Sequence, residues 1–250
     1  MRSIQRPFVR RNYLPFIACG CLGVGVGVML VAGIVVLLVI PALPGMALQI
    51  SGFKSKGNTE AVFQNIAPIP TIAVQNGVQP QQAIINLGSL GSQTIDIDPN
   101  QTQYQVVVGT SNAGAPLATV SFTESGLMDM CYQRADLCGN SNAQYRNARI
   151  DLRPGGAIIY ADVYVPDFGV WQAAGIVLRL DSSQRQLQVA GVDVGGVLYD
   201  VPPNNLGQQV SDVARVGNEL LNQLSLEASG GRYALSQVMI DDTTLTLVMR

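Results

Sequence analysis

The sequence predicts an α+β protein in which a single N-terminal transmembrane helix and a linker precede an outer domain of antiparallel strands and one long amphipathic helix. Three observations predict this class. Residues 14–40 form an apolar run without a charged residue. Apolar and polar residues alternate over much of the C-terminal half, as they do in half-buried strands. In residues 204–227 the apolar residues recur at three, four and seven positions, which is typical of a helix with one buried face.

The apolar run exceeds the roughly 20 residues that a helix needs to cross the hydrocarbon core of a membrane. Four arginines precede the run, and no acidic residue occurs before Glu60. Because positive flanks stay cytoplasmic, the chain after the helix is expected outside the cell. The sequence therefore predicts a single-pass signal anchor in the cell membrane, with a cytoplasmic tail at 1–13, a transmembrane helix at 14–40, an extracytoplasmic linker at 41–103 and an extracytoplasmic domain at 104–250.

Other interpretations of the apolar run stay open. A cleaved secretory signal has an apolar core of about 7–15 residues, shorter than this run, although Gly45-Met46-Ala47 offers small residues at a cleavage position. A lipoprotein site at Cys19 would need the run before the cysteine, and here it follows. Gly23 and Gly27 form a G-x-x-x-G pattern. This pattern either admits another membrane helix as a partner or belongs to a lone anchor.

Charge and composition exclude several kinds of function. Four of the 15 Lys and Arg residues precede the apolar run. The chain beyond the run therefore contains 11 Lys and Arg residues and all 17 Asp and Glu residues, and its net charge is −6. An acidic exterior argues against nucleic acid as a partner. Histidine is absent, which removes the commonest general base and the commonest metal ligand. We therefore expect no enzyme and no cofactor. The acidic pairs Asp96 with Asp98 and Asp241 with Asp242 lack the pattern of a calcium loop and are interpreted as turn and edge residues.

Cys131 and Cys138 are the only cysteines beyond the apolar run, so an oxidising compartment could pair them. On an unbroken helix their spacing would separate them by about 10 Å, too far for a disulfide. A bridge therefore requires the helix to end between them, which the polar stretch from Asp136 to Asn140 allows. Both the bridged and the free state stay open.

Residues 41–103 are rich in Gln, Asn, Pro, Gly and Ser, and residues 61–95 contain no charge. This composition is typical of an extended linker that has no core to fold around. The alternative is that Gln82 to Val108 contributes a strand or two. Tyr104 to Val108 has the character of a strand and is counted with the domain.

Ser121 and Glu124 have the spacing of a capping box, which predicts a helix from Thr123 to Ala135. Alternating segments separated by turn residues predict three hairpins. The long amphipathic helix is expected between the second and the third hairpin, over Asn204 to Glu227. The paired strands are Ile150–Arg153 with Ala157–Val165, Val170–Leu180 with Gln186–Val194, and Tyr233–Ile240 with Leu245–Met249.

A sheet that curls around a helix, with both apolar faces turned inward, leaves an apolar groove where packing is incomplete. Such a groove accepts acyl chains, because each buried methylene group contributes about 0.8 kcal/mol. The candidate lipid-binding residues are Val163, Val165, Leu187 and Val189 from the sheet and Leu206, Val210, Val213, Leu220 and Leu224 from the helix. A filled core is the alternative, and it would make the domain an interaction module or an accessory subunit of an envelope complex.

Three motifs carry a family resemblance: Val120-Ser121-Phe122-Thr123-Glu124, Val192-Asp193-Val194-Gly195-Gly196, and Val238 to Asp242 followed by Leu245-Thr246-Leu247. Over about residues 119–250 they resemble the YpmS-like and LmeA-like proteins of the bacterial envelope, which are similar to the tubular lipid-binding (TULIP) folds. The resemblance implies a curved antiparallel sheet wrapped on a long helix, with a lipid or other apolar molecule between them and no catalytic residue. The insertion between Cys131 and Cys138 departs from the family's pattern.

Overall fold

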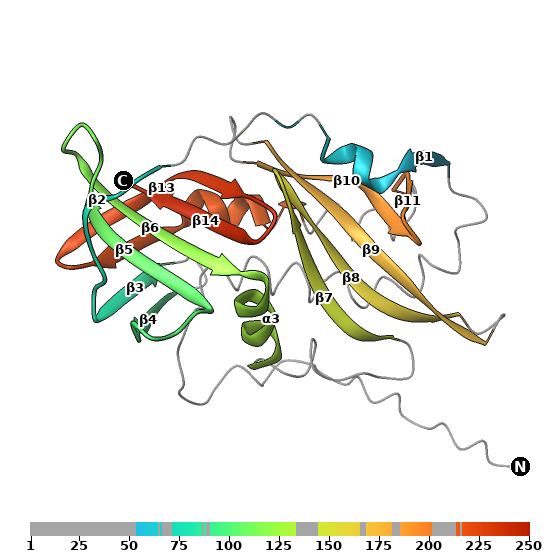
Figure 1. Cartoon of the computed structure of the whole chain (residues 1–250), viewed down its shortest axis with the longest axis horizontal. Coiled ribbons are helices and arrows are strands. Elements are labelled where there is room, and N and C mark those ends of the chain that lie inside the picture. The colour runs from blue at the N-terminus through green and yellow to red at the C-terminus, as the bar shows by residue number, and fades with distance from the viewer. Residues whose placement is uncertain are drawn as a thin grey trace, which may run out of the picture.

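In a computed structural model the chain is described over residues 54–64, 66, 72–86, 88, 91–133, 145–165, 169–181, 186–201, 214–215 and 217–250. These residues form two antiparallel sheets that lie side by side along the long axis of the molecule (Figure 1). The predicted transmembrane helix at 14–40, with Gly23 and Gly27, lies outside them. Within the described part of the chain, no helix has the length and apolar character needed to cross a membrane.

The six-stranded sheet has the order β1-β11-β10-β9-β8-β7. Its long hairpins, β7 with β8 and β9 with β10, confirm the prediction from alternation. The turn between β10 and β11 is Gly195-Gly196, with φ angles of 62° and 85°, a conformation that a residue with a side chain rarely adopts. The strands are β1 (Ser55–Asn58), β7 (Tyr145–Arg153), β8 (Gly156–Val165), β9 (Val170–Asp181), β10 (Gln186–Val194) and β11 (Val197–Tyr199).

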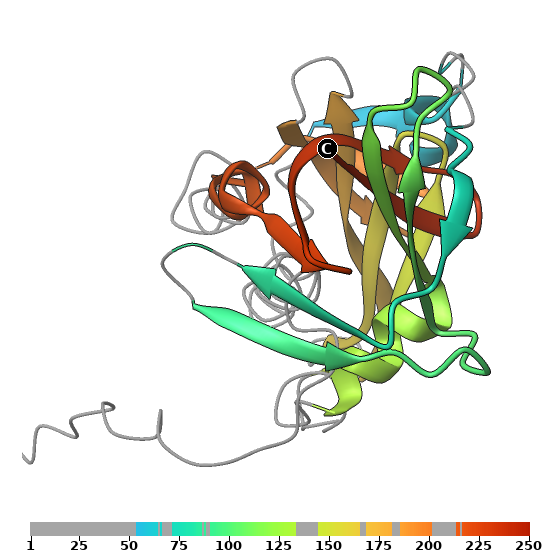
Figure 2. The same cartoon turned by 90° about the vertical axis from the view of Figure 1, so that its left-hand side faces the viewer.

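The eight-stranded sheet has the order β2-β5-β6-β14-β13-β12-β3-β4. Figure 2 shows that this sheet curls, so that β3 and β4 lie across from β5 and β6. The hydroxyl of Tyr104 on β5 donates a hydrogen bond to the carbonyl of Asp96 on β4, at 3.1 Å. The strands are β2 (Gln75–Val78), β3 (Gln82–Asn86), β4 (Ser92–Asp96), β5 (Tyr104–Thr110), β6 (Pro116–Thr123), β12 (Ser225–Ala228), β13 (Gly231–Ile240) and β14 (Thr244–Met249).

The prediction of an extended linker at 41–103 is wrong for the strands that lie within it. β1 pairs with β11 of the six-stranded sheet, and β2, β3 and β4 belong to the eight-stranded sheet. The side chains that hold β3 and β4 in place are apolar and almost fully buried, namely Ala83, Ile85 and Ile95. Their burial supplies the stabilisation that a linker composition was expected to lack. The open alternative, that Gln82 to Val108 contributes strands, is the correct one.

Helix α3 (Glu124–Gln133) confirms the predicted helix, but its cap differs from the predicted capping box. The hydroxyl of Thr123, not Ser121, accepts a hydrogen bond from the amide of Gly126 at 3.1 Å. Ser121 lies in β6, where its hydroxyl is 3.0 Å from that of Thr246. Gly126 has no room for a side chain, because a Cβ there would lie 2.0 Å from the carbonyl oxygen of Gln103.

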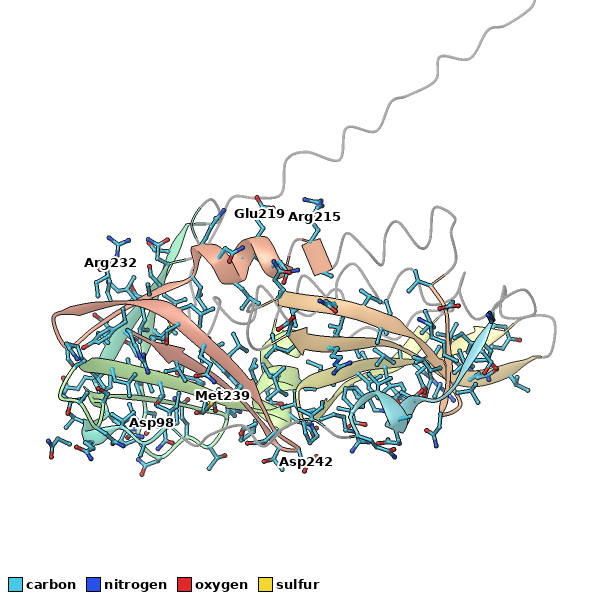
Figure 3. All side chains as sticks on the ribbon, turned by 90° about the horizontal axis from the view of Figure 1, so that it is seen from above. Asp98, Arg215, Glu219, Arg232, Met239 and Asp242 are labelled. Atoms are coloured by element: carbon cyan, nitrogen blue, oxygen red, sulfur yellow. The ribbon has the colours of Figure 1, made fainter. Side chains whose placement is uncertain are left out.

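The long amphipathic helix expected over 204–227 is wrong at its C-terminal end. The helical residues described in this segment are 214–215 and 217–223, and the chain continues as β12 from Ser225. β12 lies between β3 and β13 and pairs with both, which satisfies its backbone on two sides. Arg215 and Glu219 lie 3.7 Å apart and point away from the sheets (Figure 3). The predicted α+β fold, a curved sheet wrapped on a long helix, is therefore wrong: the described residues are mostly β-strands.

The buried apolar side chains of both sheets form one contiguous core. Val106 of β5 and Val163 of β8, one from each sheet, are both fully buried in it. A smaller cluster on the opposite face of the six-stranded sheet contains Phe63, Ile158, Val177 and Leu198. The 3-10 helix η3 (Thr59–Val62) leads into Phe63 and thus brings the N-terminal part of the described chain onto this face.

A β-bulge in β10 decides which of its residues face the main core. Val189 pairs with Leu178 and Gly191 pairs with Val177, so Ala190 is the extra residue. Leu187 and Val189 pack against the main core before the bulge, and Val192 is buried in it afterwards. Gly191 therefore lies on the face opposite that of Leu187 and Val189, and so does Asp193.

Candidate functional site

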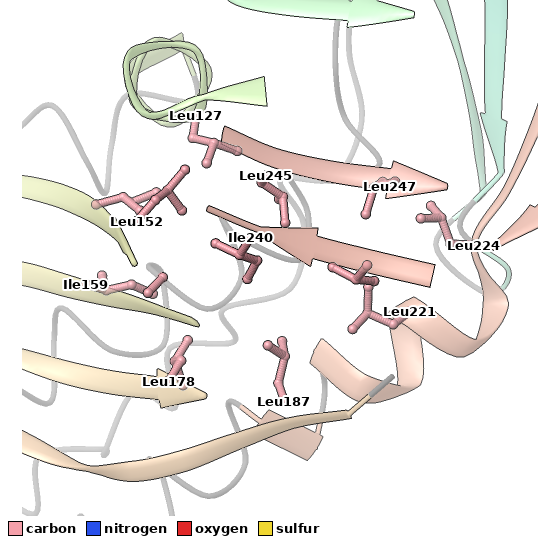
Figure 4. Close-up of a pocket in the computed structure, with 13 residues that line it drawn as sticks. Leu127, Leu152, Ile159, Leu178, Leu187, Leu221, Leu224, Ile240, Leu245 and Leu247 are labelled. Carbon is pink, nitrogen blue, oxygen red and sulfur yellow. The ribbon is translucent and has the colours of Figure 1, made fainter. Parts of the chain in front are cut away.

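An apolar cavity lies where the two sheets meet (Figure 4). Thirteen residues line it, and none of them has a polar side chain. One wall belongs to the six-stranded sheet and consists of Ile150, Leu152, Ala157, Ile159, Leu178 and Leu187. The other wall combines α3, the helix of residues 217–223 with the residue after it, and the last hairpin, through Leu127, Leu221, Leu224, Val238, Ile240, Leu245 and Leu247.

The cavity has a volume of about 80 Å³. Leaving a space of this size empty in a core costs on the order of 2 kcal/mol, at about 24 cal/mol per Å³. Apolar cavities of about 150 Å³ bind benzene or xenon and stay dry otherwise. The cavity therefore accepts a short piece of hydrocarbon as it stands, and a longer chain requires its walls to move apart.

Hydrogen bonds tie the walls of the cavity together at three places. The carboxylate of Glu124, at the start of α3, accepts a hydrogen bond from the amide of Leu152 at 2.6 Å. The amide of Gly155, in the turn between β7 and β8, donates to the carbonyl of Ile240 at 2.9 Å. The third tie is the amide side chain of Asn218, which bonds to the backbone of Leu187 on β10.

Two of the nine predicted groove residues line the cavity, Leu187 and Leu224. Three others are buried or half-buried without lining it. Val163 is fully buried in the main core, Val189 is half-buried against that core, and Leu220 is buried beside the helix residues that do line the cavity. The structure therefore brings together only part of the predicted set.

The remaining predicted residues fall where the structure gives no side-chain position. Leu206, Val210 and Val213 lie outside the described residues, and Val165 is described only as part of β8. Cys131 lies in α3, whereas Cys138 is outside the described residues, so the disulfide stays a prediction.

Sequence reasoning missed the lining residues of β7, β9, α3 and the last hairpin. The alternation that places Ile240 or Leu247 on the buried face of a strand was visible in the sequence. That signal does not separate a residue in a filled core from one beside a cavity. The difference arises from how the two sheets meet, which is a property of the assembled fold.

Titratable groups lie near the cavity but do not line it. Burial raises the pKa of the Asp151 carboxyl above its ordinary value; Arg153 opposes this rise, and Glu124 and Glu60 add to it. Arg153 lies 2.9 Å from Asp151 and 3.3 Å from Glu60. Because the cavity lining itself is wholly apolar, it can surround hydrocarbon but presents no side chain for proton transfer or nucleophilic attack.

The acidic pairs singled out in the sequence act in turns and at a strand edge. Asp241 accepts hydrogen bonds from the amides of Thr243 and Thr244 at 2.8 and 2.7 Å, which closes the turn of the last hairpin. Burial raises the pKa of the Asp241 carboxyl, but its hydrogen bonds to Thr244 and Thr243 outweigh burial and hold the pKa below the ordinary value. Asp96 accepts from the side chain of Gln82 across β3 and β4. Over the described ranges, no three His, Cys, Asp or Glu side chains gather as metal ligands would.

Comparison with family models, with curated proteins and with solved structures finds no match for this chain.

Proposed function

We propose that the protein is a membrane-anchored, extracytoplasmic domain that binds the hydrocarbon part of a lipid, or a similar apolar ligand, without catalysis. The observation that supports this is the apolar cavity between the two sheets. The membrane location rests on the charge-free run at 14–40 and its arginine flank. The polar headgroup of such a ligand would stay outside, because the lining has no partner for it.

A hydrocarbon ligand would offset the free-energy cost of the empty cavity. The empty space costs on the order of 2 kcal/mol. Two or three methylene groups entering it would recover that amount, at about 0.8 kcal/mol each. A neutral hydrocarbon tail is therefore the ligand chemistry that the site suits best.

The second candidate, an interaction module with a filled core, has less support. It would be expected to show an exposed apolar patch. Among the described residues, the large apolar side chains that stand out in solvent are Val78 and Val170. They belong to β2 and β9, in different sheets, and so they do not form a single patch.

The proposal is tested by a substitution that fills the cavity. Ala157 lines it, and Ala157→Phe would place a ring in the space that the ligand needs. We expect native mass spectrometry of the full chain, purified from membranes, to show a bound hydrocarbon-containing mass that Ala157→Phe reduces about thirtyfold, the equivalent of about 2 kcal/mol.

The matched control is Ala173→Phe. Ala173 lies on β9 of the same sheet, opposite Asp162, on the face turned away from the main core. This variant should retain the bound mass. Equal loss in both variants, or no bound mass in the unmodified chain, would contradict the proposal.

A further inference from the structure

The side chain of Asn218 makes hydrogen bonds to the backbone of β10, as a neighbouring strand would. Its side-chain oxygen accepts a hydrogen bond from the amide of Leu187 at 2.6 Å, and its side-chain nitrogen donates to the carbonyl of Leu187 at 2.9 Å. β9 lies along one side of β10, whereas β11 pairs only with Val192 to Val194. The backbone of Leu187 thus faces the helix of residues 217–223, and one amide side chain satisfies both of its polar groups.

This contact joins two walls of the cavity. Leu187 lines the cavity from β10, and Leu221, three residues after Asn218, lines it from the helix. Residues three apart lie on the same side of a helix, so Asn218 and Leu221 face β10 together. Figure 4 shows Leu187 and Leu221 pointing into the same space. A movement that breaks the Asn218 contact therefore widens the cavity at this point.

Within each wall, the strands are held together by long hydrogen-bond ladders. β8 pairs with both β7 and β9 over most of its length, and β14 pairs with both β13 and β6. Separating the strands of one wall would break many backbone hydrogen bonds, whereas the ties between the walls are one bond of Glu124, one of Gly155 and the two of Asn218. Because the cavity holds only about 80 Å³, a chain longer than a few carbons requires the walls to part at one of these ties, and Asn218 makes the tie between β10 and the helix.

We propose that Asn218 is a positioning residue that sets how fast an apolar chain enters and leaves the cavity, acting through the backbone of Leu187. This inference rests on the proposed function. It predicts that loss of the contact changes the rates of association and dissociation together, because the open state becomes more accessible while the lining that holds the ligand is unchanged. The affinity itself should change little.

The test uses octanoate, a water-soluble fatty acid, with the full chain held in a polymer scaffold free of detergent. Leucine methyl resonances, followed by NMR during a titration, report both the dissociation constant and the exchange rate. For Asn218→Ala we expect both rate constants to rise on the order of tenfold, the factor for loss of hydrogen bonds of ordinary strength. The dissociation constant should stay within about threefold of the unmodified chain.

Asn222→Ala is the matched control, because Asn222 is an exposed asparagine on the same helix. It should leave both rates unchanged. Asn218→Asp keeps the size of the side chain, but it replaces the donor to the Leu187 carbonyl by an oxygen that repels it, so it should also raise both rates even if the alanine variant folds poorly.

The outcomes separate this inference from the proposed function. Octanoate binding with unchanged rates in both Asn218 variants would overturn the role of Asn218 and leave the cavity as a binding site. Weakened affinity with a lowered melting temperature would make Asn218 merely structural, which also overturns the inference. No octanoate binding by the unmodified chain would overturn the proposed function together with the inference.

Discussion

Replacing Phe122 by alanine is expected to lower the free energy of unfolding by about 3–5 kcal/mol, as deletion of a large buried aromatic side chain does. Phe122 lies on β6, is 1% exposed and pairs in register with Tyr104 on one side and Leu245 on the other. Its ring centroid is 6.1 Å from that of Tyr104. The substitution removes contacts from the centre of the curled sheet and leaves a space that rigid strands cannot close.

Urea unfolding of the full chain measures this effect. Phe122→Leu is the control, since it keeps most of the volume and should lose about 1 kcal/mol. Val78→Ala, on the exposed edge strand β2, should change the stability by less than about 0.5 kcal/mol. A loss below about 1 kcal/mol in Phe122→Ala would contradict the placement of β6 at the centre of the core.

Replacing Thr59 by valine is expected to cost about 1–3 kcal/mol or more, because it leaves a buried carboxylate short of a partner. The Thr59 hydroxyl donates a hydrogen bond to the carboxylate of Asp193, and both residues are almost fully buried. The remaining contact is the amide of Gly196, at 3.4 Å from the other carboxylate oxygen. Valine has nearly the same shape as threonine, so the lost hydroxyl and not the packing decides the effect.

Two further variants check this interpretation in the same unfolding measurement. Thr59→Ser keeps the hydroxyl and should retain most of the stability. The double substitution of Thr59 and Asp193 by valine removes the charge together with its partner and should recover much of the loss, as replacement of buried polar pairs by apolar ones does. If Thr59→Val and Thr59→Ser behave alike, the hydroxyl does not carry the contact.

Local patterns predicted the hairpins correctly because each depends on residues close together in the sequence. Ile150 and Leu152 alternate with polar neighbours, and the Pro154-Gly155 turn supplies the reversal. The same holds for β13 and β14, where Asp241 closes the turn with its own hydrogen bonds. Alternation together with turn chemistry was enough to predict that these strands pair as hairpins.

Strands that depend on distant partners were missed. The segment that contains β3 and β4 is rich in polar residues, and this composition led to the prediction of a linker although Ala83 and Ile85, and Ile95 and Ile97, recur at every second position. β12 begins two residues after the helical residues 217–223, and its first three residues fall inside the helix expected over 204–227. Pairing with β3, some 140 positions earlier, overrides that local preference. No window of the sequence contains both partners.

The sequence predicted that the candidate site is apolar, but it did not predict where the cavity lies. Leu187 and Leu224 were chosen as apolar residues on facing elements, and both line the cavity. The position of the cavity depends on the angle at which two sheets meet, and the contact of Asn218 with Leu187 depends on a helix end placed by tertiary structure. Neither the position of the cavity nor the contact of Asn218 produces a periodic pattern in the sequence.

Photolabelling with a diazirine-bearing fatty acid tests the central claim most directly, because it reports where on the chain a hydrocarbon tail sits. With the full chain in membranes, we predict covalent labels on peptides that contain residues 150–159, 217–224 or 238–247, and their loss in Ala157→Phe but not in Ala173→Phe. Labels confined to residues 14–40, or labels on the cavity peptides that Ala157→Phe leaves unchanged, would contradict binding in the cavity between the sheets.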